Sequence, residues 1–124
     1  MKNIDLDATH TTPSIKFGEN GKLIIKGRSI PSDVSVFYKP LIEWAGELQL
    51  NALTVDIDLE YVNSASSKKL LTFMKVLDSN NSIRELTVNW HYEKDDEDSF
   101  VNGQVFEKLI PKARFNFIAD TDIA

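Results

Sequence analysis

The sequence predicts a single α/β domain in which a mixed sheet of about five strands carries its helices mainly on one face. Residues 53–60 and 86–92 alternate strictly between apolar and polar side chains, which is typical of strands covered on one side only. Between them, residues 66–78 place apolar side chains on one helical stripe: Leu70, Phe73, Met74 and Leu77. The order strand, helix, strand favours a parallel pair. The polar side of both strands predicts an open sheet face.

The N-terminal part of the chain predicts a hairpin and a helix. Residues 1–12 are polar and read as an unpacked lead-in to one domain over residues 1–124. The run "SIKFGENGKLIIKG" follows, and its Asn20-Gly21 step supplies the backbone freedom that a hairpin turn needs. Apolar residues at helical spacing over 34–48 predict a helix. Pro40 should kink this helix or mark its first turn.

The C-terminal part predicts a loop, a helix and a last strand. The acidic run "EKDDED" at 93–98 is expected to be a loop. A helix should follow through Val101, Val105, Phe106, Leu109 and Ile110 and stop at Pro111, and "ARFNFIAD" should form the final strand. Trp44 and Trp90 are expected in the core.

Composition narrows the classes of function. The chain is 42% hydrophobic and 27% charged, close to globular averages, and its net charge of -5 argues against binding of nucleic acid. The absence of cysteine excludes disulfides and thiolate sites. The first twenty residues do not resemble an export signal, and no apolar run has the length that spans a bilayer. We therefore expect a cytoplasmic protein without a cofactor, a nucleic-acid partner or a membrane partner.

Three serines stand where the strand around residues 53–60 gives way to a helix: Ser64, Ser66 and Ser67. The simplest interpretation is helix capping by Asn63 or Ser64, which contributes about 1 kcal/mol. A cap does not need three hydroxyls, however, and serine in the first turn lowers helix propensity. Two functional interpretations therefore stay open.

In the first, Ser64 accepts a phosphate. The group would add a charge of roughly -1.5 to -2 at the positive end of a helix, where an anion is favoured by ~0.3–1 kcal/mol. Lys68 lies one turn further along and could pair with it. The protein would stay folded while its surface changed sign, and a partner with an acidic or apolar binding surface would be repelled.

In the second, Ser64 is the nucleophile of a hydrolase with His91 as its base. The sequence "VNSAS" lacks the glycines of the G-x-S-x-G elbow, which disfavours this hypothesis. His10 and His91 are isolated in the sequence, so no metal site is predicted.

Asp56, Asp58 and Glu60 form a row of carboxylates on one strand face. Such a row suggests a site for a hard cation or an acid/base pair, but it is more often the solvated side of a sheet, and a docking surface for a basic partner is the second interpretation. The acidic run at 95–98 lacks the ligand pattern and the glycine of a calcium loop.

Several segments together resemble the SiaC-type regulatory phosphoproteins. They are "TTPSI" at 11–15, "GRSIPSD" at 27–33, "FYKPLIEW" at 37–44, "LEYVNSASSKKLL" at 59–71 and "NWHYEKDDED" at 89–98. The resemblance spans roughly residues 10–120. Its most specific parts are the Tyr61 to Ser64 junction and the Trp-His-Tyr end of the strand that contains His91.

The resemblance implies a STAS-like fold and a partner switch without enzymatic activity. The phosphoacceptor of the family follows the asparagine and falls on Ser64, with Ser66 and Ser67 as alternatives, since Ala65 replaces a second hydroxyl residue. Tyr61, Asn63 and Lys68 would surround the phosphate, and Asp56, Asp58, Glu60 and His91 are candidates for a partner surface.

The resemblance also implies three partners. A cognate kinase would add the phosphate and a PP2C-type phosphatase would remove it. In the best-known member of the family, the unmodified protein binds and activates a diguanylate cyclase and so controls cyclic-di-GMP and biofilm formation. An anti-sigma factor antagonist of the STAS type and a constitutive adaptor are the alternatives.

Overall fold

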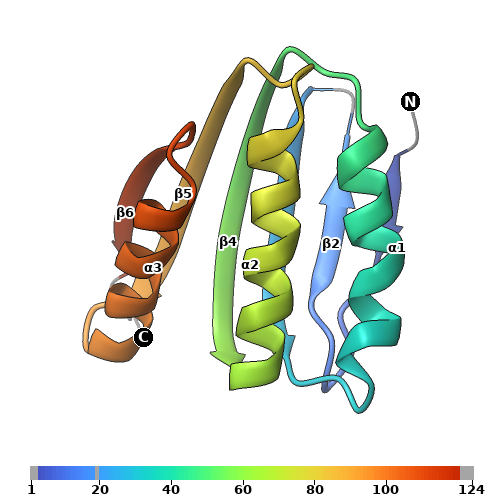
Figure 1. Ribbon diagram of the computed structural model, residues 1–124. Helices are drawn as coiled ribbons and strands as arrows, with labels where there is room; N and C mark the ends of the chain where they lie inside the picture. The colour runs from blue at the N-terminus through green and yellow to red at the C-terminus, as the bar shows by residue number, and fades with distance from the viewer. Residues whose placement is uncertain (1–2, 19, 121–124) are drawn as a thin grey trace.

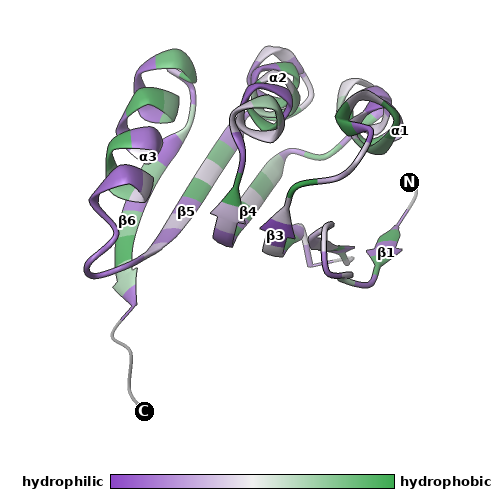
Figure 2. Cartoon of the chain, turned by 90° about the horizontal axis from the view of Figure 1, so that it is seen from below, coloured by the Kyte–Doolittle hydropathy of each residue, from purple (hydrophilic) through white to green (hydrophobic). Residues whose placement is uncertain are grey.

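In the computed structural model, which describes residues 3–18 and 20–120, one mixed sheet carries all the described helices on a single face (Figure 2). The sheet has six strands in the order in which they occur in the chain. They are β1 (Ile4–Leu6), β2 (Ser14–Phe17), β3 (Lys22–Ser29), β4 (Ala52–Val62), β5 (Glu85–Glu93) and β6 (Arg114–Asp120). The helices are α1 (Val34–Glu47), α2 (Ser64–Ser79) and α3 (Glu97–Leu109). The predicted fold class is confirmed.

The pairing of the strands follows from their connections. Strands β1, β2 and β3 are antiparallel neighbours, whereas β3, β4, β5 and β6 run parallel and are joined by one helix each (Figure 1). The predicted hairpin is the β2–β3 pair. Gly21 ends its turn with a φ of 74°, which a residue with a side chain adopts only with strain. Within the described residues, no helix is long and apolar enough to cross a membrane.

The N-terminal segment was expected to be an unpacked lead-in, and this expectation is wrong for residues 4–6. They form β1, which pairs with β2 and makes a sixth strand. Lys16 of β2 forms ion pairs with Asp5 and Asp7, and the pairing with Asp7 lowers the pKa of that carboxyl. A strand of three residues is too short to leave a clear periodic signal in the sequence, even though Ile4 and Leu6 flank Asp5.

Helix α1 begins six residues before its proline. Asp33 caps it by accepting a hydrogen bond from the amide of Val36 at 3.1 Å, so the helix starts at Val34 and Pro40 lies in its interior. Of the two predicted roles of Pro40, that of a first-turn residue is therefore wrong. Pro40 is exposed, which leaves the carbonyl that loses its donor free to bind water.

Helix α3 takes in the end of the acidic run, which was expected to be a loop throughout. Asp96 caps the helix by accepting from the amide of Ser99 at 3.0 Å, and Glu97 and Asp98 occupy the first turn. Carboxylates are favoured there because the first amides of a helix are unpaired and carry partial positive charge. Charge alone therefore does not mark a loop.

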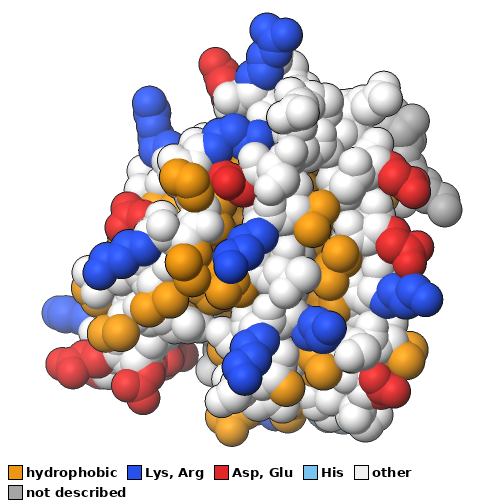
Figure 3. All heavy atoms as spheres, viewed as in Figure 1, with side chains coloured by type: hydrophobic (Ala, Val, Ile, Leu, Met, Phe, Trp, Pro, Cys, Tyr) orange, Lys and Arg blue, Asp and Glu red, His pale blue; other side chains and the backbone are white. Residues whose placement is uncertain are grey.

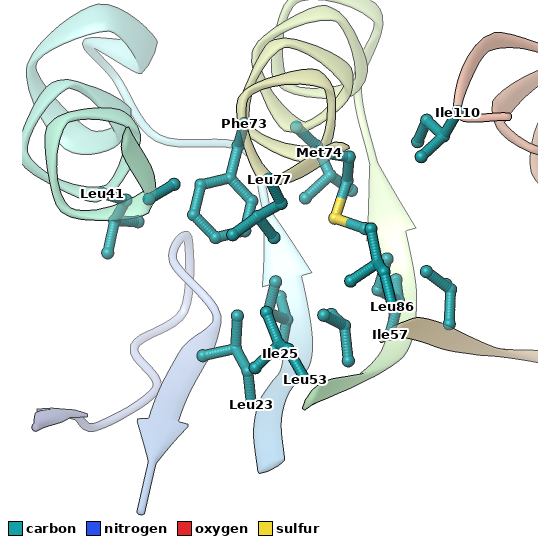
Figure 4. Packing of buried hydrophobic residues seen from close by; sticks show 14 of the residues in the cluster. Leu23, Ile25, Leu41, Leu53, Ile57, Phe73, Met74, Leu77, Leu86 and Ile110 are labelled. Atoms are coloured by element: carbon teal, nitrogen blue, oxygen red, sulfur yellow. The ribbon is translucent and has the colours of Figure 1, made fainter. Parts of the chain in front are cut away.

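The core lies between the sheet and the helices. Figure 4 shows Phe73 and Leu77 of α2 pointing toward Leu23 and Ile25 of β3. Both tryptophans are buried as predicted: Trp44 packs against Phe17 and Phe73, and Trp90 packs against Phe106. No helix of the described residues lies on the opposite face of the sheet, and this side is the open, polar face that the alternating strands predict (Figure 2).

Helix α3 approaches the sheet closely at Gly103. A Cβ atom at this position would lie 2.8 Å from Trp90 Cδ1 and 2.8 Å from Phe117 Cε1. We expect Gly103→Ala to lower the free energy of unfolding by up to about 2 kcal/mol, because overpacking costs ~1–3 kcal/mol and better helix propensity returns ~1 kcal/mol. Urea denaturation followed by circular dichroism measures the change.

Gly46→Ala is the matched control. Its Cβ would meet Val76 Cγ1 at 3.6 Å, an ordinary contact, on an exposed part of α1. We expect this variant to be neutral or more stable by up to about 1 kcal/mol. Equal changes in the free energy of unfolding of the two variants would show that α3 and the sheet leave room for a Cβ atom at position 103.

Candidate functional site

Ser64 is the first residue of α2 and is exposed to solvent. Asn63 is the N-cap: its side chain accepts a hydrogen bond from the amide of Ser66 at 2.8 Å, and its carbonyl accepts from the amide of Ser67 at 2.9 Å. The cap is therefore Asn63, and the Ser64 hydroxyl is not needed for it. Within the described residues, that hydroxyl makes no hydrogen bond.

The other two serines lie in different surroundings. Ser66 is fully buried, and its Oγ has no hydrogen-bond partner among the described residues. Ser67 is half-buried, and its Oγ accepts a hydrogen bond from Asn102 Nδ2 of α3 at 3.2 Å. Of the three serines, Ser64 is therefore the one that another protein can reach most easily.

Ser64 lines an open pocket of about 360 Å³ between the end of β4, the start of α2 and the start of α3. Three carboxylates, those of Glu60, Asp96 and Asp98, belong to its lining, and no Lys or Arg does. Figure 3 shows acidic side chains gathered at the lower left of the molecule, where α3 begins, and basic side chains over α2. The pocket beside the Ser64 hydroxyl is therefore negative.

A bulge shapes the end of β4. The pairing of β3 with β4 passes from Gly27–Leu59 to Arg28–Tyr61 and so skips Glu60. Glu60 accepts a hydrogen bond from Arg28 Nε at 2.7 Å and lines the pocket, while Tyr61 is 58% exposed. Of the predicted surroundings, Tyr61 and Asn63 line the pocket with Ser64, and Lys68 is exposed one turn further along α2.

A buried polar pair fastens the junction to the core. The hydroxyls of Ser29 and Tyr38 are 2.6 Å apart, and the amide of Asn63 donates to the carbonyl of Ser29 at 3.4 Å. Burial raises the pKa of the Tyr38 hydroxyl, which keeps it protonated and able to donate. The backbone before Ser64 is thereby held against β3 and α1, so the exposed hydroxyl stands on a fixed support.

The predicted row of carboxylates is divided between two surfaces. Asp56 lies on the open face, where it pairs with Lys22 at 3.2 Å and accepts a hydrogen bond from Asn89 at 2.7 Å. Asp58 lies on the same face, whereas Glu60 belongs to the pocket of Ser64. The bulge therefore places Glu60 beside Ser64, out of line with Asp56 and Asp58.

His91 is placed away from Ser64 and close to two carboxylates. Its Nδ1 lies 3.5 Å from Asp120 Oδ1, and ligand atoms of Asp58, His91 and Asp120 all lie within 4.8 Å of one another. The Ser64 hydroxyl makes no hydrogen bond to His91. Sequence reasoning treated His91 as isolated and missed this group. The alternation placed Asp58 and His91 on polar strand faces, but only the register of β6 brings in Asp120.

Comparisons with known proteins agree with this arrangement. The structure is similar to that of SiaC of Pseudomonas aeruginosa, with 21% identity over 98% of this chain and 99% of that chain and a TM-score of 0.78. It is similar to apo-SiaC from the same organism, with 23% identity over 97% and 99% of the two chains and a TM-score of 0.77. At these identities, the likeness establishes the fold.

A third similar structure is that of the diguanylate cyclase SiaD in complex with its activator SiaC from Pseudomonas aeruginosa. The identity is 23% over 98% of this chain and 99% of that chain, with a TM-score of 0.76. A search of curated proteins found no match. The model of the SiaC family regulatory phosphoproteins matches residues 6–120. The resemblance seen in the sequence is thereby confirmed, and the chain belongs to the SiaC family of regulatory phosphoproteins.

Proposed function

We propose that this protein is a partner switch controlled by reversible phosphorylation of Ser64. A cognate kinase adds the phosphate, a PP2C-type phosphatase removes it, and the unmodified form binds and activates a diguanylate cyclase. The observation that carries the proposal is the exposed Ser64 hydroxyl, which has no hydrogen bond within the described residues and stands at the first position of α2. The SiaC of the complex with SiaD, described as an activator, supports the choice of partner.

The charges of the pocket support a switch that acts by repulsion. A phosphate on Ser64 meets favourable amide dipoles at the start of α2 and the ammonium of Lys68 on the same side. It also enters a pocket whose lining already carries the carboxylates of Asp96 and Asp98. Like charges in one partly enclosed pocket repel, so the modification disfavours any partner that must bring apolar or acidic groups into it.

The acceptor residue is tested by incubating the full chain with its cognate kinase and ATP. We expect one phosphate per molecule by intact mass and its assignment to Ser64 by fragmentation. Ser64→Ala should remain unlabelled. Ser67→Ala is the matched control, because it removes a neighbouring hydroxyl of the same helix, and it should be labelled like the wild type.

Undiminished labelling of Ser64→Ala would move the acceptor elsewhere and contradict the proposal. Circular dichroism melts of both variants exclude loss of the fold as the cause of lost labelling. Ser64 is exposed and Asn63 supplies the cap, so we expect Ser64→Ala to unfold within about 0.5 kcal/mol of the wild type. Ser67→Ala loses the hydrogen bond to Asn102, and we expect it to be less stable by about 0.5–1.5 kcal/mol but still folded.

A further inference from the structure

Two successive rows of polar side chains cross β4, β5 and β6 on the open face of the sheet. In the first, Asn89 donates to Asp56 at 2.7 Å, Asn116 donates to Asn89 at 3.0 Å, and Lys22 pairs with Asp56 at 3.2 Å. Each side chain of this row has a partner. The row is therefore complete without any ligand.

The second row, nearer the carboxyl ends of the strands, lacks such partners. It consists of Asp58, His91 and Asp120, which stands one pleat beyond Ile118, the register partner of His91. The side-chain contact within this group is the long one of 3.5 Å between His91 Nδ1 and Asp120 Oδ1. Lys26 is the register neighbour of Asp58 on β3, yet within the described residues Asp58 forms neither an ion pair nor a hydrogen bond. Two carboxylates thus face one imidazole, and no Lys or Arg of the described residues pairs with either of them.

The donor set is that of a divalent transition metal. One imidazole nitrogen and two carboxylate oxygens suit Zn²⁺, whereas Mg²⁺ and Ca²⁺ prefer oxygen ligands alone. A tetrahedral ion with bonds of about 2.0–2.2 Å holds its ligand atoms about 3.4 Å apart. The ligand atoms here lie within 4.8 Å of one another, so each pair must approach by at most about 1.4 Å to reach that geometry.

The position of the three residues in the sheet also suits a metal site. They come from three adjacent strands of one sheet, and the side chain of His91 is 22% exposed while that of Asp120 is 43% exposed. Rigid strands fix the ligand positions better than loops do. Solvent access leaves the remaining coordination position open to water or to a group of another molecule.

We propose that Asp58, His91 and Asp120 bind one Zn²⁺ ion, or a related divalent transition metal, on the open face of the sheet. The ion neutralises two carboxylates that lie close together and that pair with no Lys or Arg of the described residues. None of the three residues lines the pocket of Ser64, and the proposed metal site does not depend on phosphorylation of Ser64 being correct.

Isothermal titration of the full chain with ZnCl₂ tests the site. We expect one ion per chain and an affinity at least about tenfold weaker in His91→Gln and in Asp58→Asn. MgCl₂ at the same concentrations should not bind. His10→Gln removes the other histidine and should leave binding unchanged. Thermal melts establish that each variant is folded. If His91→Gln does not fold, Asp120→Asn replaces it as the variant that removes a ligand.

A second control separates a specific site from general negative charge. Asp56→Asn removes a carboxylate from the same strand face, one pleat away, and we expect it to bind Zn²⁺ like the wild type. In NMR spectra, Zn²⁺ should shift the ring nitrogens of His91 and not those of His10. Absence of Zn²⁺ binding by the wild type, or equal losses in Asp56→Asn and Asp58→Asn, would overturn the proposal.

Discussion

Phosphorylation of Ser64 should weaken binding to the proposed partner, a diguanylate cyclase, by at least about tenfold, which corresponds to about 1.4 kcal/mol. The unmodified hydroxyl is exposed beside a pocket that already contains Glu60, Asp96 and Asp98. The phosphate adds a charge of roughly -1.5 to -2 there, and a partner surface that enters the pocket must face or desolvate it. Titration of the cyclase with the purified phosphorylated and unmodified forms measures the change, and cyclic-di-GMP synthesis reports activation.

Three variants sharpen this experiment. Ser64→Ala, treated with kinase and ATP, should keep full affinity, whereas Ser64→Asp should lose part of it because a carboxylate carries less charge than a phosphate. The double variant Asp96→Asn, Asp98→Asn lowers the negative charge of the pocket and should restore part of the affinity of the phosphorylated form. Asparagine caps a helix about as well as aspartate, so the change at Asp96 preserves the start of α3.

Equal affinity of the phosphorylated and unmodified forms would contradict the switch. A constitutive adaptor, in which the serines only support the start of a helix, gives this result. If the two forms bind equally and Ser64 is still labelled normally, Ser64 is phosphorylated but its phosphorylation does not control binding of the partner.

The strongly periodic segments of the fold could be predicted from the sequence, and the short or locally capped segments could not. Strands β4 and β5 are recognisable because each buries one face and alternates accordingly, and α2 is recognisable by its apolar stripe. Strand β1 has three residues and exposes most of them, so its pairing with β2 depends on tertiary context. The start of α3 was hidden because acidic residues favour both loops and first helical turns.

In the candidate site, too, features set by nearby residues could be predicted and features set by tertiary contacts could not. Asn63 as a cap and the exposure of Ser64 follow from local sequence, since both depend on residues a few positions apart. The approach of Asp96 and Asp98 to Ser64 depends on how α3 lies on the sheet, and the group around His91 depends on the register of three strands. Neither is encoded in a local pattern.

Phe73→Ala should lower the free energy of unfolding by about 3–5 kcal/mol, the largest effect we expect on stability. Phe73 is 2% exposed and stacks on Trp44 of α1 with ring centroids 6.5 Å apart, while its other side faces β3 (Figure 4). Removing the ring leaves a cavity between α1, α2 and the sheet that their backbones cannot collapse to fill. Urea denaturation of the wild type and the variant measures the loss.

Val36→Ala is the control for this prediction, because Val36 also lies on a helix but is 68% exposed and packs against little. We expect a change within about 0.5 kcal/mol. Loss of the Phe73 ring should also speed amide hydrogen exchange along α2, the helix that begins with Ser64, relative to exchange in the strands. If Phe73→Ala were about as stable as Val36→Ala, packing of the Phe73 ring would not be what fixes α2 on the sheet. The position of Ser64 would then depend on the contacts of Asn63 and Ser29.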